Sequence, residues 1–339
     1  MSGKLATMLG MVCALLASAT ASAADSVSYR PQIHGTLRPR LEMTTEGPAA
    51  YHFQLRNARL SIGGFIAPQI DYFIQSDFCD KGSMKILDGW VRLAMAPGLK
   101  FQAGQFRMPF AVDPFRAPHN YLFANRSFIG RQMFNYRAVG AKLSYALPRI
   151  PLTLEAGAFN PGKIGDHGPW NRSVAFGSKA TLKIGNVALE AGFASISPDS
   201  VRMNVVDGTV SWQSGRWSAE AEYMNKHYCG RNLKNAHAWN GWVDYRMPIK
   251  AGIFNRLSFQ GRFDGMTAHS SGSRNATGVP VVNNPARNRI TVGATISHVR
   301  SAGMYLDIRA DYEKYFYHSN AVITPDMASK AILEMVLRF

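Results

Sequence analysis

The sequence predicts an all-β fold, a transmembrane antiparallel β-barrel of about 16 strands. Segments of about ten residues in which every second side chain is apolar recur along the chain, and this period of two is typical of strands. Beyond the N-terminus, no apolar run reaches the roughly 20 residues that a membrane-spanning helix needs. The connections between the segments also alternate between short and long, as in a barrel that crosses a membrane.

The N-terminus predicts export. Lys4 is followed by a mostly apolar stretch over residues 5–16 and by Ala21-Ser22-Ala23, a small-x-small cleavage site. We therefore expect a signal peptide over residues 1–23 and a mature barrel over 24–339. A single membrane anchor is the alternative, but the apolar stretch is too short for it. The two cysteines of the mature chain, Cys79 and Cys229, are interpreted as incidental thiols.

Alternation of apolar and polar side chains marks each predicted strand. In the last one, Leu333, Met335 and Leu337 share one face, while Glu334 and Arg338 share the other. The predicted strands are, in order, 31–43, 51–66, 69–79, 86–96, 98–107, 138–147, 152–160, 174–185, 187–196, 203–212, 217–227, 237–247, 253–266, 288–299, 304–316 and 329–339.

The predicted connections sort into two classes. Short turns fall at 68, 97, 185–186, 214–215 and 301–303, and longer connections cover 108–137, 161–173, 267–287 and 317–328. An even strand number puts both termini on the periplasmic side, with short turns there and longer loops outside. The alternative is a secreted β-sandwich or a repeat array, but a sandwich of this length needs several domains, and the sequence shows no linker after about residue 50.

Two further features favour a barrel in the outer membrane. The amphipathic end of the chain, which terminates in Phe339, resembles the terminal signal of outer-membrane barrel proteins. Aromatic residues gather near strand ends, as in the girdles at the two membrane interfaces, with ordinary core packing as the alternative. They are Trp212, Trp217, Trp239, Trp242, Tyr245 and 315–317.

The connection over residues 108–137 is much longer than usual loops, and such loops are generally functional or disordered. Its many aromatic side chains argue against disorder, and we expect it to fold into the barrel as a constriction loop. It would then bring four arginines and one acid, Asp113, into the channel. The arginines are Arg116, Arg126, Arg131 and Arg137.

The charge balance predicts an anionic partner. Lysine and arginine number 38 against 22 acidic residues, a formal net charge of +16. The basic residues are spread along the chain without the basic helix or zinc-finger spacing of nucleic-acid binders, so we expect small anions rather than nucleic acid. Strand parity places further cations in the lumen: Arg38, Arg40, Lys100, Lys142, Lys179, Lys183, Arg262 and Arg309. The acids of that parity are Asp71, Glu155, Glu190, Glu220, Glu222 and Asp307.

Four motifs resemble the phosphate-selective porins O and P. They are Arg56-Asn57-Ala58-Arg59-Leu60, Gly104-Gln105-Phe106-Arg107-Met108-Pro109-Phe110, Arg126-Ser127-Phe128 and Arg137-Ala138-Val139-Gly140. The resemblance covers about residues 51–160 and implies a sixteen-stranded, usually trimeric, anion-conducting channel whose third loop folds inward. Arg107 stands where this family commonly has lysine.

Together, these observations predict an outer-membrane porin with a water-filled, anion-selective channel for phosphate or a similar small anion. The candidate anion-binding residues are Arg116, Arg126, Arg131, Arg137, Arg38, Arg40, Arg59, Arg107 and Lys142. The expected partners are small anions, outer-membrane lipid and two further copies of the chain in a homotrimer.

The alternatives are an outer-membrane enzyme of the lipase or protease type and a structural or adhesive barrel. The sequence has no Gly-x-Ser-x-Gly, His-Glu-x-x-His or Cys-x-x-Cys pattern. We therefore expect no enzymatic activity, cofactor or metal. The residues leave open whether the anion is phosphate, pyrophosphate, a sugar acid or chloride.

Overall fold

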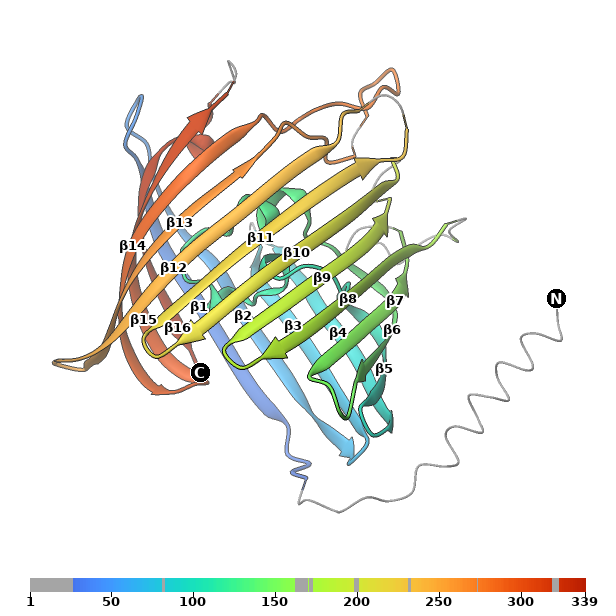
Figure 1. Ribbon diagram of the computed structural model, residues 1–339. Coiled ribbons are helices and arrows are strands. Elements are labelled where there is room, and N and C mark those ends of the chain that lie inside the picture. The colour runs from blue at the N-terminus through green and yellow to red at the C-terminus, as the bar shows by residue number, and fades with distance from the viewer. Residues whose placement is uncertain are drawn as a thin grey trace.

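The computed structural model describes residues 27–80, 83–161, 170, 173–197, 201–230, 233–272, 274–318 and 323–339. The predicted signal peptide, residues 1–23, lies outside these ranges. The described part of the chain forms one closed barrel of sixteen strands (Figure 1). This confirms the predicted fold class and excludes the β-sandwich.

The strands follow one another along the chain, and each predicted range overlaps one of them. They are β1 (Gln32–Thr44), β2 (Tyr51–Ala67), β3 (Ile70–Asp80), β4 (Ser83–Ala96), β5 (Leu99–Arg107), β6 (Arg137–Ala146), β7 (Leu152–Phe159) and β8 (Ala175–Ile184). The second half comprises β9 (Val187–Ile196), β10 (Met203–Ser214), β11 (Trp217–Tyr228), β12 (Ala236–Ala251), β13 (Phe254–Met266), β14 (Arg287–Ser301), β15 (Met304–Tyr317) and β16 (Lys330–Arg338).

Every strand pairs antiparallel with its neighbours in the chain, and β16 pairs with β1 to close the barrel. Closure leaves no strand edge with unpaired amide groups, which is the condition for crossing hydrocarbon with strands. The strand β12 extends to Ala251, beyond the predicted end at residue 247. Pro248 cannot donate a ladder hydrogen bond, but the strand accommodates it because the register with β13 shifts directly after it.

The two faces of the wall are opposite in character. Outward side chains such as Phe53 and Ile66 are 78% and 67% exposed, whereas inward Arg289 and Glu313 are fully buried. An apolar outer surface around a polar interior is the pattern of a barrel surrounded by lipid. The protein is therefore a barrel of the bacterial outer membrane. None of the helices in the described ranges is long and apolar enough to cross a membrane.

The aromatic side chains near strand ends divide between the two faces. Trp212 and Trp217 are exposed on the outside, and the ring of Trp217 lies 4.6 Å from that of Tyr245, between centroids. In contrast, Trp242 donates a hydrogen bond to the luminal Glu220, and Tyr315 is buried inside. The outer girdle is thus smaller than we expected from the sequence, because strand parity turns some of these rings inward.

Between β5 and β6, residues 108–136 fold into the barrel, and we call them the inner loop. They contain three short helical turns, η1 (Asp113–Phe115), η2 (Pro118–Asn120) and η3 (Ile129–Met133). Figure 1 shows this segment inside the ring of strands. The predicted inward-folded third loop is confirmed. A fourth short turn, η4 (Pro325–Met327), lies in the connection before β16.

The barrel closes on the C-terminal aromatic residue. The backbone amide of Gly35 donates to the carbonyl of Phe339 at 2.7 Å, and the amide of Phe339 donates back to Gly35 at 3.2 Å. The Phe339 ring covers Gly35, since a Cβ atom added at Gly35 would lie 2.1 Å from the ring. An aromatic side chain here shields a glycine of the neighbouring strand, a device that pins strand pairing.

We expect Gly35→Val to weaken closure, because its side chain would occupy the place of the Phe339 ring. Overpacking of this kind costs about 1–3 kcal/mol, and the measurement is equilibrium unfolding of the folded barrel in urea. Gly208→Ala is the matched control, since an added Cβ there meets no atom within 4 Å. Equal stability of the two variants would show that the Phe339 ring does not hold the seam.

Candidate functional site

Apolar side chains at both ends of the inner loop anchor it to the barrel wall. Met108, Phe110, Phe128 and Phe134 are at most 2% exposed and belong to one buried cluster. The wall leaves room for them at glycines, because a Cβ added at Gly177 would lie 2.2 Å from the Met108 side chain. The aromatic residues that argued against disorder in the sequence therefore fix the loop by packing.

Arginines of the wall bind the backbone of the inner loop. Four consecutive carbonyl oxygens, those of residues 123–126, each accept a hydrogen bond from at least one wall guanidinium. The pairs are Arg309 to Phe123 at 3.1 Å, Arg38 and Arg40 to Ala124 at 2.8 and 2.7 Å, Arg262 to Asn125 at 2.8 Å, and Arg289 to Arg126 at 2.7 Å. Buried carbonyl groups outside regular secondary structure need such partners.

Acidic residues of the wall bind the amide groups of the same loop. Glu222 accepts from the amides of Val112 and Asp113 at 2.8 and 3.2 Å. In the same way, Asp311 accepts from Ala124 at 2.6 Å, and Asp264 accepts from Phe128 at 2.9 Å. The wall thus holds the loop through its backbone donors and acceptors at several points.

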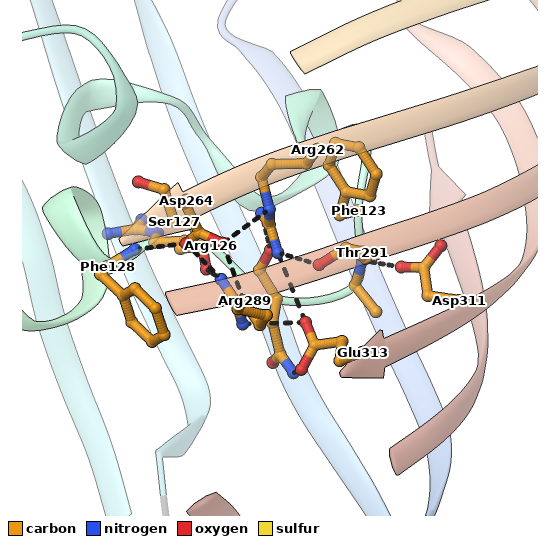
Figure 2. A network of polar contacts seen from close by, with 12 residues as sticks. Phe123, Arg126, Ser127, Phe128, Arg262, Asp264, Arg289, Thr291, Asp311 and Glu313 are labelled. Carbon is orange, nitrogen blue, oxygen red and sulfur yellow. Dashed lines mark hydrogen bonds and ion pairs between the residues drawn. The ribbon is translucent and has the colours of Figure 1, made fainter. Parts of the chain in front are cut away.

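Buried ion pairs connect these wall residues to one another. Glu334 binds the guanidinium groups of Arg38, Arg40 and Arg309 at 2.8, 2.6 and 3.4 Å. A second group joins Arg289 to Asp264 and to Glu313 at 2.8 and 2.9 Å (Figure 2). Figure 2 also shows Arg289 between Asp264 and Glu313, close to the loop residues 126–128. Such shared carboxylates neutralise arginines that would otherwise repel one another inside the barrel.

On the other side of the inner loop lies a cavity of about 430 Å³ between the loop and β1–β4. Its polar lining is strongly basic, because eight cationic side chains and one acid, Asp77, border it. The cations are Arg38, Arg40, Arg56, Arg59, Lys85, Arg126, Arg131 and Arg137. The inner loop thus lies against a wall of ion pairs on one side, and on its other side it borders a cavity with a cationic lining.

Six of the nine candidate residues line this cavity. They are Arg38, Arg40, Arg59, Arg126, Arg131 and Arg137. Arg59 binds Asp77 at 2.8 Å, and Arg137 binds Asp88 at 3.0 Å. Their role in anion binding stays a prediction, because Arg38 and Arg40 also serve to hold the inner loop.

The other three candidates lie elsewhere. Arg107 donates to the carbonyl oxygens of Pro114 and Arg116, at 2.6 and 2.9 Å, and so stabilises the backbone of the inner loop. Arg116 is paired with Glu220 on the far side of the loop. Lys142 binds Glu155 at 2.5 Å.

Sequence reasoning missed two cations of the cavity, Arg56 and Lys85. Lys85 comes from the first residues of β4, which the alternation pattern left outside the predicted strand. Arg56 belongs to one of the motifs quoted above, but no parity argument selected it. The reason is a local irregularity of β2, which is described below.

His119 on the inner loop adds no charge at neutral pH. Burial, together with the nearby positive charges of Arg338, Arg59 and Arg38, lowers the pKa of His119 to about 4. Within the described ranges, no three His, Cys, Asp or Glu side chains are grouped as metal ligands. The charged groups that line the cavity are arginine and lysine side chains and the acid Asp77.

The closed barrel with an inner loop and a charged cavity is similar in fold to outer-membrane porins of known structure. No family model matches the chain, and no curated protein matches it. Among solved structures, the anion-selective porin from Comamonas acidovorans is similar with a TM-score of 0.64 at 10% identity, over 91% of this chain and 99% of that one.

Two further solved structures share the fold. The in-vitro folded OmpT of Vibrio cholerae, an outer membrane protein in its trimer form, matches with a TM-score of 0.59 at 12% identity, over 91% of this chain and 98% of that one. A mutant porin of Rh. blastica matches at 0.54 and 9% identity, over 91% and 100%. These identities establish a common fold and nothing finer.

We expect Glu334→Gln to destabilise the barrel and loosen the inner loop, because it leaves three buried arginines without their shared carboxylate. Breaking a buried ion pair from one side costs about 3–5 kcal/mol. Guanidinium unfolding of the folded protein measures the loss. Glu155→Gln, which breaks the partly exposed pair with Lys142, is the control and should change stability far less. A Glu334 variant as stable as this control would contradict the anchoring role.

Proposed function

We propose that the protein is an anion-selective porin, with phosphate or a similar small oxyanion among the ions that it conducts. The observation that carries this proposal is the cavity beside the inner loop, where eight cationic side chains face one acid. A narrow passage with such a lining and low-dielectric walls concentrates anions and repels cations.

The arrangement of the inner loop determines where ions can pass. Hydrogen bonds between its backbone and side chains of β1, β11 and β13–β15 hold the loop in place. The space left open lies along β1–β4, where the cations gather. Toward the short turns, further cavities of about 220 and 640 Å³ adjoin the loop residues around Asn120 and Leu122. We infer that ions move through these spaces in succession.

Guanidinium chemistry supports oxyanions as the conducted species. An anion that enters the passage loses part of its water shell, and arginine replaces it with forked N–H donors that match phosphate and carboxylate geometry. Several moderate sites in a row favour transport over tight capture. The pairs Arg59 with Asp77 and Arg137 with Asp88 moderate the field in this way.

We also propose a homotrimer. The trimer form of OmpT from Vibrio cholerae shares the fold, which supports this assembly. On the outer surface, an apolar groove of about 540 Å³ crosses β14–β16 and β1. Leu41, Met43, Val292, Tyr312 and Leu333 contribute to its lining, and the groove offers a place for side chains of a second copy.

The triple variant Arg59→Gln, Arg126→Gln, Arg131→Gln should lower the ratio of anion to cation permeability, on the order of tenfold, because it removes cations where the field is focused. Reversal potentials of single channels in a salt gradient measure this ratio directly.

The control for this prediction removes the same charge elsewhere. Arg149, Lys250 and Arg300 are exposed near the short turns, and their replacement by glutamine should leave the permeability ratio close to that of the parent. A parent channel that prefers cations would contradict the proposed function, and so would equal ratios for the two triple variants.

A further inference from the structure

Strand β2 contains one residue more than its pairing with β1 requires. Arg38 lies opposite Asn57, and Pro39 lies opposite Leu55, so that Arg56 has no partner on β1. This is a β-bulge, in which one strand carries two residues against one on its neighbour. The register is regular on both sides of it.

The bulge coincides with a proline inside a closed sheet. Pro39 has no N–H group for the ladder, and a closed barrel offers no edge strand where proline is usually tolerated. The pairing of β1 with β16 also omits Arg38 and Pro39, although its register is unchanged across them. The bulge of β2 therefore lies opposite Pro39, the residue of β1 that has no N–H group to donate to the ladder.

The bulge changes which side chains face the lumen. Leu55 is exposed on the outer face, whereas Asn57 is 5% exposed inside the barrel. Strict alternation would give the lumen one residue out of the pair Arg56 and Asn57, but both line the cationic cavity. The extra residue thus places one more guanidinium in the passage without moving any other side chain to the wrong face.

The guanidinium of Arg56 faces several positive charges and makes no ion pair with a carboxylate among the described residues. Among the described residues, neither Arg56 nor Arg131 has a side-chain hydrogen bond or an ion pair, whereas Arg59 and Arg137 of the same cavity each bind an aspartate. The positive charges of Arg40, Arg131 and Arg59 act on Arg56, and the negative charge of Asp77 opposes them more weakly. Both Arg56 and Arg131 are exposed to the cavity, one from the wall and one from the inner loop.

We propose that Arg56 and Arg131 form a binding site for a multivalent oxyanion in the channel. The proposal rests on the anion-conducting function above. Two unpaired guanidinium groups on opposite sides of one cavity repel each other, and a ligand with several oxygen atoms and two charges can accept N–H donors from both. A halide carries one charge and fits this pair less well, so the binding site favours multivalent oxyanions over halides.

The geometry of the bulge allows an unusual test, the deletion of Arg56. After deletion, Leu55 directly precedes Asn57, and the pairs Arg38 with Asn57 and Pro39 with Leu55 become neighbours in an unbroken ladder. We therefore expect the shortened barrel to assemble and to keep its heat-modifiable mobility. Deletion of Ser61, which lies in the regular part of β2, is the control, and it should prevent assembly because it moves half of the strand to the opposite face.

The ligand test uses chloride current through single channels with inorganic phosphate or sulfate added as blockers. We expect deletion of Arg56, Arg56→Gln and Arg131→Gln each to raise the half-blocking concentration of either dianion by about tenfold, as for loss of one charge-assisted hydrogen-bonding group. The double variant of Arg56 and Arg131 should add little to the single ones, because both residues bind the same ion. Arg149→Gln should keep the parent's value.

The outcomes separate this inference from the proposed function. If the parent prefers anions but Arg56→Gln and Arg131→Gln leave block by both dianions unchanged, the proposed binding site is wrong and the proposed anion channel is still supported. A parent that prefers cations overturns both. Independent, additive effects of the two substitutions would contradict a shared ion. Arg56→Gln keeps the ligand test valid even where the deletion variant does not assemble.

Discussion

The interaction on which the rest of the structure depends is the binding of the inner-loop backbone by charged side chains of the wall. A segment without regular secondary structure cannot satisfy its own buried amide and carbonyl groups, so these groups need partners on the wall. Wall arginines bind four consecutive carbonyl groups, and wall acids bind the amides of Val112, Ala124 and Phe128. The position of the loop, and with it the open part of the lumen, follows from these contacts.

The same contacts explain how a strongly basic chain concentrates its charge on one side. Acids on β13, β15 and β16 neutralise the arginines that hold the loop, with Glu334 and Glu313 each shared between several of them. Along β2–β4, Asp77 and Asp88 are the carboxylates that pair with cavity arginines in the described ranges. Anchoring of the loop and lining of the cavity are therefore concentrated on different strands, except that Arg38 and Arg40 of β1 contribute to both.

The sequence predicts the barrel well because a period of two residues and alternating connection lengths are local properties. The inward fold of the inner loop also follows, since its aromatic side chains need a wall. The role of each arginine does not follow from parity. Arg107 binds carbonyl groups of the inner loop and Arg116 binds Glu220 of β11, whereas Arg126 and Arg131 line the cavity. Arg56 escapes parity altogether, because a bulge is a relation between two strands and leaves no mark in one.

Recognition of the inner loop through its main chain has a consequence for substitutions in the loop. A hydrogen bond to the carbonyl of Ala124 or Arg126 does not depend on the side chain at that position. The Arg126 side chain lines the cavity, so a substitution there changes the lining while the carbonyl keeps its partner on the wall. The buried neighbour Phe128 lacks this freedom because its side chain packs inside the barrel, and Arg38 and Arg40 are constrained twice, as anchors of the loop and as lining of the cavity.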